Sequence, residues 1–212
     1  MKRRSDKIGF IIGYFGERQP DVQSELHFGN AYQLLVATML AAQCTDKRVN
    51  MVTPALFEAY PTPAALSQAT EGEILTFIKS VSYPNSKAAH LSAMAMMLVQ
   101  EFGGEVPGTM EDLTRLPGVG RKTANVVLAF AFGQAAMPVD THVFRVAHRL
   151  GLVKDAPTPE AVERLLVAQF PREVLSKAHH WLLLHGRYVC TARKPHCEAC
   201  PLTKICDSYT KP

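Results

Sequence analysis

Apolar residues recur along the chain at helical spacing, and few stretches alternate in the way that β-strands do. In residues 172–189 one helical stripe contains Val174, Ala178, Trp181, Leu182 and His185. Helix-start signals stand before three further apolar segments: Asn30, Thr109 with Asp112 in the pattern of a capping box, and Thr158 followed by a proline. Residues 5–18 fit a short N-terminal helix. The pattern predicts an all-α protein.

Two long stretches carry no charge, Phe28–Thr45 and Thr123–Val139. Each contains Gln or Asn and small residues, so both fit buried helices better than membrane spans, although Gly133 and Pro138 interrupt the second. The N-terminus is basic, but no long apolar run follows it, and no signal peptide is predicted. We expect a cytoplasmic protein with no membrane partner.

Composition adds little to this picture. The 212 residues suit one large domain or two small ones, and a hydrophobic fraction of 47% is enough for a sizeable core. The net charge of +4 is compatible with a nucleic-acid partner, but many unrelated proteins are as basic.

Four of the five cysteines crowd the C-terminus with the spacing Cys-x6-Cys-x2-Cys-x5-Cys; they are Cys190, Cys197, Cys200 and Cys206. An odd total and one tight cluster argue against a disulfide framework. Structural zinc usually takes two Cys-x2-Cys pairs, and only one is present, so the spacing favours an iron–sulfur centre; zinc and unligated thiols remain alternatives. Arg193 and Lys194 in the first loop either lie in solvent or contact phosphate.

The stretch "LPGVGRKTA", Leu116 to Ala124, joins a glycine-containing turn to the start of a helix. Gly118 and Gly120 allow positive φ and close approach, and the amides of the helix start can bind an anion such as phosphate. A tight connection between two helices would need the same glycines, so the motif alone leaves both interpretations open.

Lys122 stands in the first turn of that helix, where a cation is misplaced. Its helical neighbours Asn125, Val126 and Ala129 make its face mostly apolar. Burial and a helix N-terminus both disfavour the ammonium form, and a neutral amine can form a Schiff base. The alternative is a lysine whose head reaches solvent or a phosphate. Asp140 follows a proline and begins "DTHVFRVAHRL", so its first expected role is that of an N-cap.

These segments together resemble the endonuclease III family of DNA glycosylases. "LPGVGRKTA" is similar to the family's helix-hairpin-helix motif, "VDTHVFRVAHRL" to the segment with its aspartate, and the cysteine spacing to its [4Fe–4S] loop. "MLAAQCTDKRVN" and "HGRYVC" also resemble family segments, and the likeness runs from about residue 8 to 207.

The resemblance implies an all-α fold of two lobes. Residues 24–134 would form a six-helix lobe with the helix-hairpin-helix, and residues 1–23 with 135–212 a smaller lobe that holds the [4Fe–4S] cluster through the four cysteines. Lys122 would be the Schiff-base nucleophile and Asp140 the aspartate that assists it. Backbone amides in the turn would hold a DNA phosphate; this turn contains Leu116, Gly118, Val119 and Gly120.

The implied function is a bifunctional glycosylase and abasic-site lyase, which removes oxidised pyrimidines from duplex DNA and then breaks the strand by β-elimination. Its substrate base must leave the duplex, and Gln43 and Tyr83 match positions that enter the resulting gap. Family members often carry Leu-Tyr where this chain has Tyr83-Pro84, which leaves the opposite-base preference open. A monomer associated with the bacterial nucleoid is expected.

Two rival functions are considered. The adenine-specific mismatch glycosylase shares the cluster and the hairpin, but it lacks a lysine at the position of Lys122. A non-catalytic DNA-binding module with a structural metal would keep the motifs without the chemistry. Strand cleavage by the purified protein separates the second from an enzyme.

Overall fold

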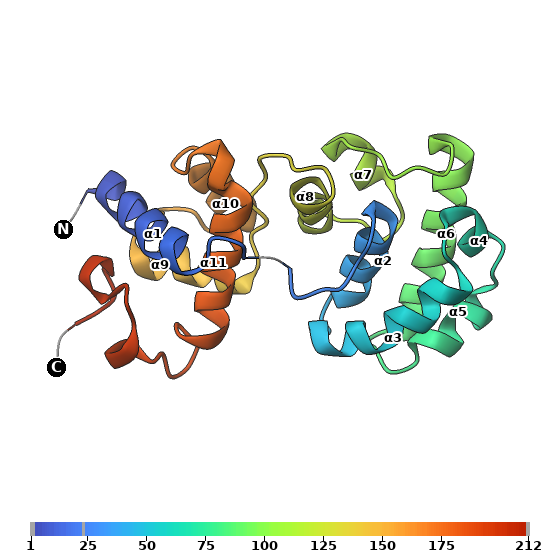
Figure 1. Ribbon diagram of the computed structural model, residues 1–212, viewed down its shortest axis with the longest axis horizontal. Helices are drawn as coiled ribbons and strands as arrows, with labels where there is room; N and C mark the ends of the chain where they lie inside the picture. The colour runs from blue at the N-terminus through green and yellow to red at the C-terminus, as the bar shows by residue number, and fades with distance from the viewer. Residues whose placement is uncertain (1–2, 23, 211–212) are drawn as a thin grey trace. The chain divides into compact units, whose positions relative to one another are not determined.

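The computed structural model describes residues 3–22 and 24–210, and in these ranges every regular element is a helix (Figure 1). The predicted all-α fold is confirmed. Within the same ranges no helix has both the length and the apolar character needed to cross a membrane. The chain forms two compact units, Ser24–Gln134 and the combination of Met1–Gln23 with Ala135–Pro212.

The unit Ser24–Gln134 consists of seven helices, and all of them except α6 and α8 begin at a side-chain cap. They are α2 (Ala31–Ala41), α3 (Asp46–Ala59), α4 (Pro63–Ser67), α5 (Glu71–Ile78), α6 (Pro84–Phe102), α7 (Met110–Arg115) and α8 (Arg121–Phe130). α4 and α5 pack on α6, and α2 packs on α3 and α8. The resemblance implies six helices, and the structure describes seven in this unit, of which α4 with five residues is the shortest.

The other unit takes one helix from the N-terminal part of the chain and the rest from the C-terminal part. It consists of α1 (Arg4–Arg18), α9 (Thr141–Leu150), α10 (Pro159–Val167), α11 (Leu175–Tyr188) and 3-10 turns at Arg172–Val174, Cys197–Ala199 and Thr203–Ile205. Phe15 of α1 stacks on Trp181 of α11 at 5.9 Å between ring centroids, and the Trp181 indole donates to the Gln19 carbonyl at 3.1 Å. Apolar burial thus joins segments that are far apart in sequence.

The cap positions read from the sequence are found in the structure. Asn30 accepts from the Gln33 amide, Thr109 from Asp112, and Thr158 from Ala161. The expectation for the uncharged stretch Thr123–Val139 is only half right. α8 ends at Phe130 and an irregular segment follows, which contains the Gly133 and Pro138 that interrupt helical pattern.

Candidate functional site

The stretch from α7 to α8 is a helical hairpin with a tight turn. The amide of Leu116 donates to Leu113 at 3.2 Å, and that of Val119 donates to Leu116 at 3.0 Å, so both amides are used inside the hairpin. Gly118 has φ +77°, and a Cβ there would lie 2.8 Å from Cβ of His90 on α6. Positive φ and this close approach both require glycine.

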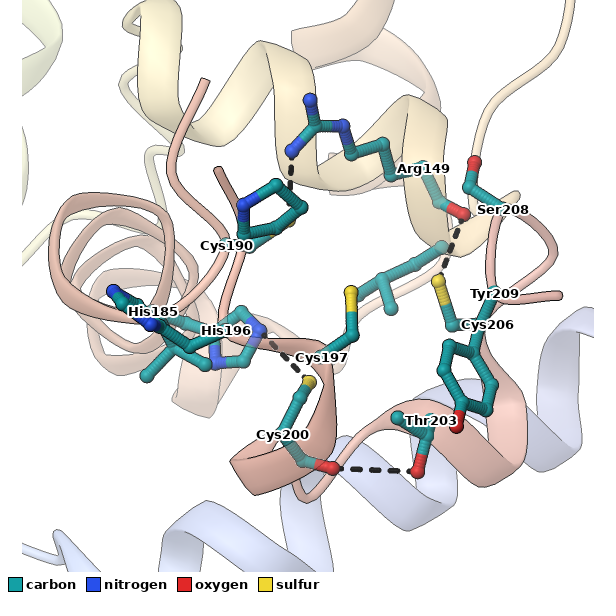
Figure 2. A pocket seen from close by; sticks show the side chains of 13 residues that line it. Arg149, His185, Cys190, His196, Cys197, Cys200, Thr203, Cys206, Ser208 and Tyr209 are labelled. Atoms are coloured by element: carbon teal, nitrogen blue, oxygen red, sulfur yellow. Dashed lines mark hydrogen bonds between the residues drawn. The ribbon is translucent and has the colours of Figure 1, made fainter. Parts of the chain in front are cut away.

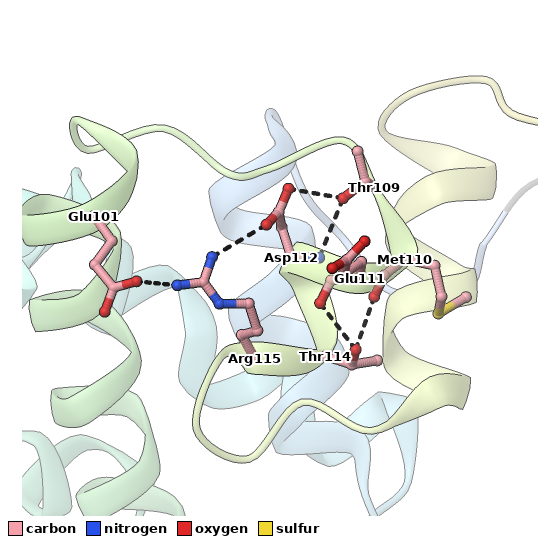
Figure 3. Close-up of polar contacts among 7 residues, drawn as sticks. All are labelled: Glu101, Thr109, Met110, Glu111, Asp112, Thr114 and Arg115. Carbon is pink, nitrogen blue, oxygen red and sulfur yellow. Dashed lines mark hydrogen bonds and ion pairs between the residues drawn. The ribbon is translucent and has the colours of Figure 1, made fainter.

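Polar contacts fix α7 on α6 at the start of the hairpin (Figure 3). The Thr109 hydroxyl accepts from the Asp112 amide at 3.1 Å and donates to the Asp112 carboxylate at 2.8 Å. Arg115 pairs with Asp112 at 3.2 Å and with Glu101 of α6. These contacts hold the first helix of the hairpin, and with it the position at which the turn begins.

Lys122 lies in the first turn of α8 and is exposed. The residues three, four and seven positions further along, Asn125, Val126 and Ala129, are buried as the pattern predicts. The burial of Lys122 itself is not found, because the helix buries its face only from Ala124 onwards and the first turn projects into solvent. Gly120, the N-cap, has no side chain to bond the first amides of α8.

Asp140 is the N-cap of α9, as the sequence predicts. Its Oδ1 accepts from the amides of His142 at 2.9 Å and Val143 at 2.8 Å. The second oxygen, Oδ2, takes no part in the cap, and the residue is only half-buried. Lys122 and Asp140 belong to different units of the fold.

Gln43 and Tyr83 lie at the ends of two helices that the fold brings together. Gln43 follows α2, and Tyr83 immediately precedes α6. Both side chains are exposed, Tyr83 to 66%, and both residues have positive φ, 53° and 54°. The Ser82 hydroxyl donates to the Gln43 carbonyl at 2.7 Å. Sequence reasoning selects the two positions but does not predict this connection.

The four C-terminal cysteines surround one cavity of ≈ 240 Å³ in the unit that contains both chain ends. Figure 2 shows Cys197, Cys200 and Cys206 turned towards this space. Cys44 belongs to the other unit. A cavity of this size lined by four thiols suits a cluster of several atoms better than a single zinc ion.

The groups around the sulfurs also suit such a centre. Burial raises the pKa of the Cys200 and Cys206 thiols, so their thiolates need a cationic or metal partner. The backbone amide of Leu202 forms a hydrogen bond to Cys200, and those of Ser208 and Tyr209 form hydrogen bonds to Cys206. Each of these hydrogen bonds favours the thiolate. Hydrogen bonds from backbone amides to sulfur are a recurrent feature of iron–sulfur sites.

Two side chains beside the cavity are not among the site residues that the sequence predicts. Arg149 at the end of α9 donates to Cys190 Sγ at 3.4 Å. The His185 ring on α11 lies 3.6 Å from Cys200 Sγ, and burial lowers its pKa to about 4, so it is neutral at physiological pH. A basic residue in the last turn of a helix is the only sequence signal for Arg149, and it indicates nothing about sulfur.

Arg149 also organises the loop that contains Arg193 and Lys194. Its guanidinium donates to the carbonyls of Thr191 at 2.7 Å and Ala192 at 2.9 Å. The Thr191 hydroxyl closes the loop on the Lys194 carbonyl at 2.6 Å. Arg193 and Lys194 are both exposed. The loop therefore exposes two cationic side chains on a backbone that these hydrogen bonds hold in place.

The fold, the hairpin and the cysteine cavity define a class of protein. Residues 36–172 match the family described as HhH-GPD superfamily base excision DNA repair protein, and residues 190–206 match the iron–sulfur binding domain of endonuclease III. The chain is therefore a helix-hairpin-helix DNA repair protein.

Its relatives narrow the class. Endonuclease III of Rickettsia conorii is 47% identical over 95% of this chain and 96% of its own length, and that of a Synechocystis species 48% identical over 98% and 93%. A solved structure of a trapped endonuclease III–DNA covalent intermediate aligns with TM-score 0.91 and 40% identity, over 98% of this chain and 97% of that one.

The chain belongs to the endonuclease III family. It is a bifunctional DNA glycosylase and abasic-site lyase of base excision repair, it binds DNA, and it contains a [4Fe–4S] cluster. The predictions of fold, activity and cofactor are confirmed, and neither rival function is favoured.

Proposed function

We propose that this enzyme removes oxidised pyrimidines from duplex DNA with Lys122 as the nucleophile and Asp140 as its assistant. The observation that carries the proposal is the position of Lys122, an exposed amine in the first turn of α8, two residues after the hairpin turn. Exposure leaves the amine open to a substrate, and DNA bound against the turn would remove water from it.

The lysine performs both bond-breaking steps. Its amine forms a bond to C1′ of the deoxyribose while the bond from C1′ to the base breaks, and the proton that the lysine nitrogen then loses goes to the leaving base. Opening of the sugar ring gives an imine between C1′ and Nζ, which makes the C2′ proton acidic. Water or the released base accepts that proton, the electron pair forms the C2′–C3′ double bond, and the C3′–O bond breaks so that the 3′ phosphate leaves as an anion. Water then hydrolyses the imine and frees Lys122.

Asp140 supplies a carboxylate with one oxygen to spare. Oδ1 is held by the two amides of the α9 cap, which fixes the plane of the carboxylate. Oδ2 is outside the cap and can stabilise positive charge on the sugar or orient the amine of Lys122. The same residue thus serves the helix and the reaction with different atoms.

Phosphate binding is assigned to the hairpin turn and the basic loop. Among the turn residues Leu116, Gly118, Val119 and Gly120, the amides of the two glycines and the start of α8 are the main candidates, since those of Leu116 and Val119 bond within the hairpin. Arg193 and Lys194 add a second phosphate contact from the loop that Arg149 holds.

The exposed side chains of Gln43 and Tyr83 fill the gap left by the extruded nucleotide. A planar amide and a ring can stack on the remaining bases, which offsets part of the cost of unstacking. Their placement next to each other through Ser82 supports a joint role. We refer to them below as the gap-filling pair.

Cys190, Cys197, Cys200 and Cys206 are the proposed ligands of the [4Fe–4S] cluster, since all four line one cavity. The cluster supplies no step of the base-removal chemistry in this proposal. Its bound form fixes the loop between Cys190 and Cys197, and so the cations at Arg193 and Lys194. We further propose a monomer that acts on DNA of the bacterial nucleoid in the cytoplasm.

Borohydride trapping tests the nucleophile. Borohydride reduces the imine to a stable amine, so the wild type should become covalently joined to duplexes with thymine glycol or an abasic site. Uracil and 8-oxoguanine duplexes should give little adduct. Lys122→Gln should abolish trapping yet still bind abasic DNA, because the phosphate site is mainly backbone. Asp140→Asn keeps a capping oxygen but loses the charge, so it should bind DNA and turn over slowly.

The matched control is Lys79→Gln, which removes an exposed lysine from the end of α5 in the same unit. It should trap DNA like the wild type. An adduct formed by Lys122→Gln at the wild-type rate would assign the nucleophile to another amine. Equal rates on thymine glycol and 8-oxoguanine would overturn the proposed substrate class.

A further inference from the structure

Both residues of the gap-filling pair have a backbone conformation that their own local preferences disfavour. Gln43 and Tyr83 both lie in the left-handed region, with φ of 53° and 54°, where a residue with a Cβ is disfavoured. Such residues persist when the surrounding structure over-determines them. The hydrogen bonds at this place come from Lys87 of α6 and from Ser82, two residues before α6 begins.

Lys87, in the first turn of α6, crosses to the C-terminal end of α2. Its Nζ donates to the carbonyls of Leu40 and Ala42, each at 2.7 Å, and the residue is only 8% exposed. Carbonyls in the last turn of a helix have no partner within the helix, and they carry the negative end of its dipole. An ammonium group is the natural partner there, although burial lowers the Lys87 pKa and a neighbouring Cys44 opposes that effect.

Five consecutive backbone carbonyls, from Met39 to Gln43, each accept a hydrogen bond. Met39 and Ala41 accept from the amides of Ala42 and Cys44. The other three carbonyls accept hydrogen bonds from side chains of a separate segment. Lys87 donates to Leu40 and Ala42, and Ser82 donates to Gln43. The segment with Gln43 and the segment with Tyr83 are therefore joined by three side-chain bonds.

We propose that Lys87 is a positioning residue for damage recognition, which caps α2 from α6 and thereby holds Gln43 and Tyr83 in one arrangement before DNA arrives. The inference rests on the proposed gap-filling role of that pair. Backbone that is already held in one conformation loses less conformational entropy when the side chains it carries enter the duplex. Lys87 touches neither the substrate nor Lys122 in this scheme, so it affects extrusion and not the later elimination.

The test compares base removal from a duplex and from a single strand with the same thymine glycol. Lys87→Met keeps the length and apolar stem of the side chain but has no donor. It should slow removal from the duplex by about tenfold, the scale of modest misplacement, and leave the single strand within about twofold. A fluorescent 2-aminopurine beside the lesion should show reduced extrusion. Lys87→Arg, which retains donors, should recover most of the duplex rate.

Two matched variants keep the test decisive. Lys79→Met removes the exposed lysine that follows α5 and should leave both rates unchanged. Ser82→Ala removes the other bond to the pair, and should show a smaller selective loss even if Lys87→Met folds poorly. Circular dichroism and thermal unfolding show whether each variant is folded.

Gln43→Ala and Tyr83→Ala separate the inference from the function on which it rests. If these two lose duplex activity selectively while Lys87→Met and Ser82→Ala do not, the positioning role is overturned and the gap-filling role stands. If neither Gln43→Ala nor Tyr83→Ala loses more activity on duplex than on single strand, the gap-filling role is wrong, and the positioning role that depends on it is wrong as well. Equal loss on duplex and single strand in folded Lys87→Met would make Lys87 a purely structural cap.

Discussion

At Gly118 two independent constraints fall on one residue. Its φ of +77° disfavours any side chain, and a Cβ would meet three atoms of His90, the nearest at 2.8 Å. Because two of those atoms are Cβ and Cγ, the histidine cannot give way by turning its ring alone. The sequence pattern predicts a glycine-containing turn, but only the contact with His90 of α6 shows that there is no space for a side chain at Gly118.

Gly118→Ala should therefore destabilise the fold by about 1–3 kcal/mol, from left-handed strain plus crowding. It should also weaken binding to a duplex with an abasic-site analogue, because the phosphate-binding turn must shift. Urea unfolding and a fluorescence-polarisation titration measure the two effects. Gly72→Ala is the control, since its Cβ would meet only Thr70 at 3.9 Å in helix α5. Wild-type stability in Gly118→Ala would contradict the argument.

At the scale of elements, the cysteine loop shows why a cofactor can be structural. Residues 190–206 contain only two 3-10 turns, which have few backbone bonds of their own. Yet this segment inserts Leu202 and Ile205 into the core of its unit, where both are almost fully buried. Four ligands on one cluster would hold the loop so that these two side chains stay in place.

Cys200→Ser should reduce iron from about four atoms per chain and bleach the yellow-brown absorbance, as expected for a damaged cubane. The same change should lower the unfolding midpoint, because Leu202 and Ile205 would lose their anchor. Iron analysis and thermal unfolding measure both. Cys44→Ser, which lies in the other unit, should retain full iron. Stoichiometric zinc in a colourless, active wild-type protein would contradict the assignment.

At the scale of the whole molecule, the two ends of the chain belong to one unit. The buried Lys7 of α1 donates to the Leu150 carbonyl at 2.6 Å and pairs with Asp207 at 2.5 Å, 200 residues away in sequence. Phe15 and Trp181 add an apolar contact between the same parts. The N-terminal helix is thus a component of the core that carries the cysteine loop.

Lys7→Met should lower the free energy of unfolding by about 2–4 kcal/mol, because removal of one partner leaves the Leu150 carbonyl and the Asp207 carboxylate without their cation. The partial exposure of Asp207 keeps the loss below that of a fully buried pair. Guanidinium unfolding of the holoprotein measures it. Lys177→Met removes an exposed lysine of α11 and should change stability little. Equal stability of both variants would show that the pair is dispensable.

Local chemistry explains what could be read from the sequence. The caps at Asn30, Thr109 and Thr158 depend on bonds within three residues, so their patterns predict where α2, α7 and α10 begin. The spacing of the four cysteines likewise favours a cluster over zinc within one short segment. The family resemblance rests on the same short motifs, which is why activity and cofactor follow from the sequence.

Only the tertiary structure decides what depends on distant neighbours. Lys122 is exposed although its helical face is apolar, since burial of α8 begins only at Ala124, two residues later. Nothing in the sequence around Lys87 indicates that it caps a helix 47 residues away, or that Arg149 reaches Cys190 across 41 residues. Such pairs are set by how helices pack, and packing is a property of the whole core that no local pattern encodes.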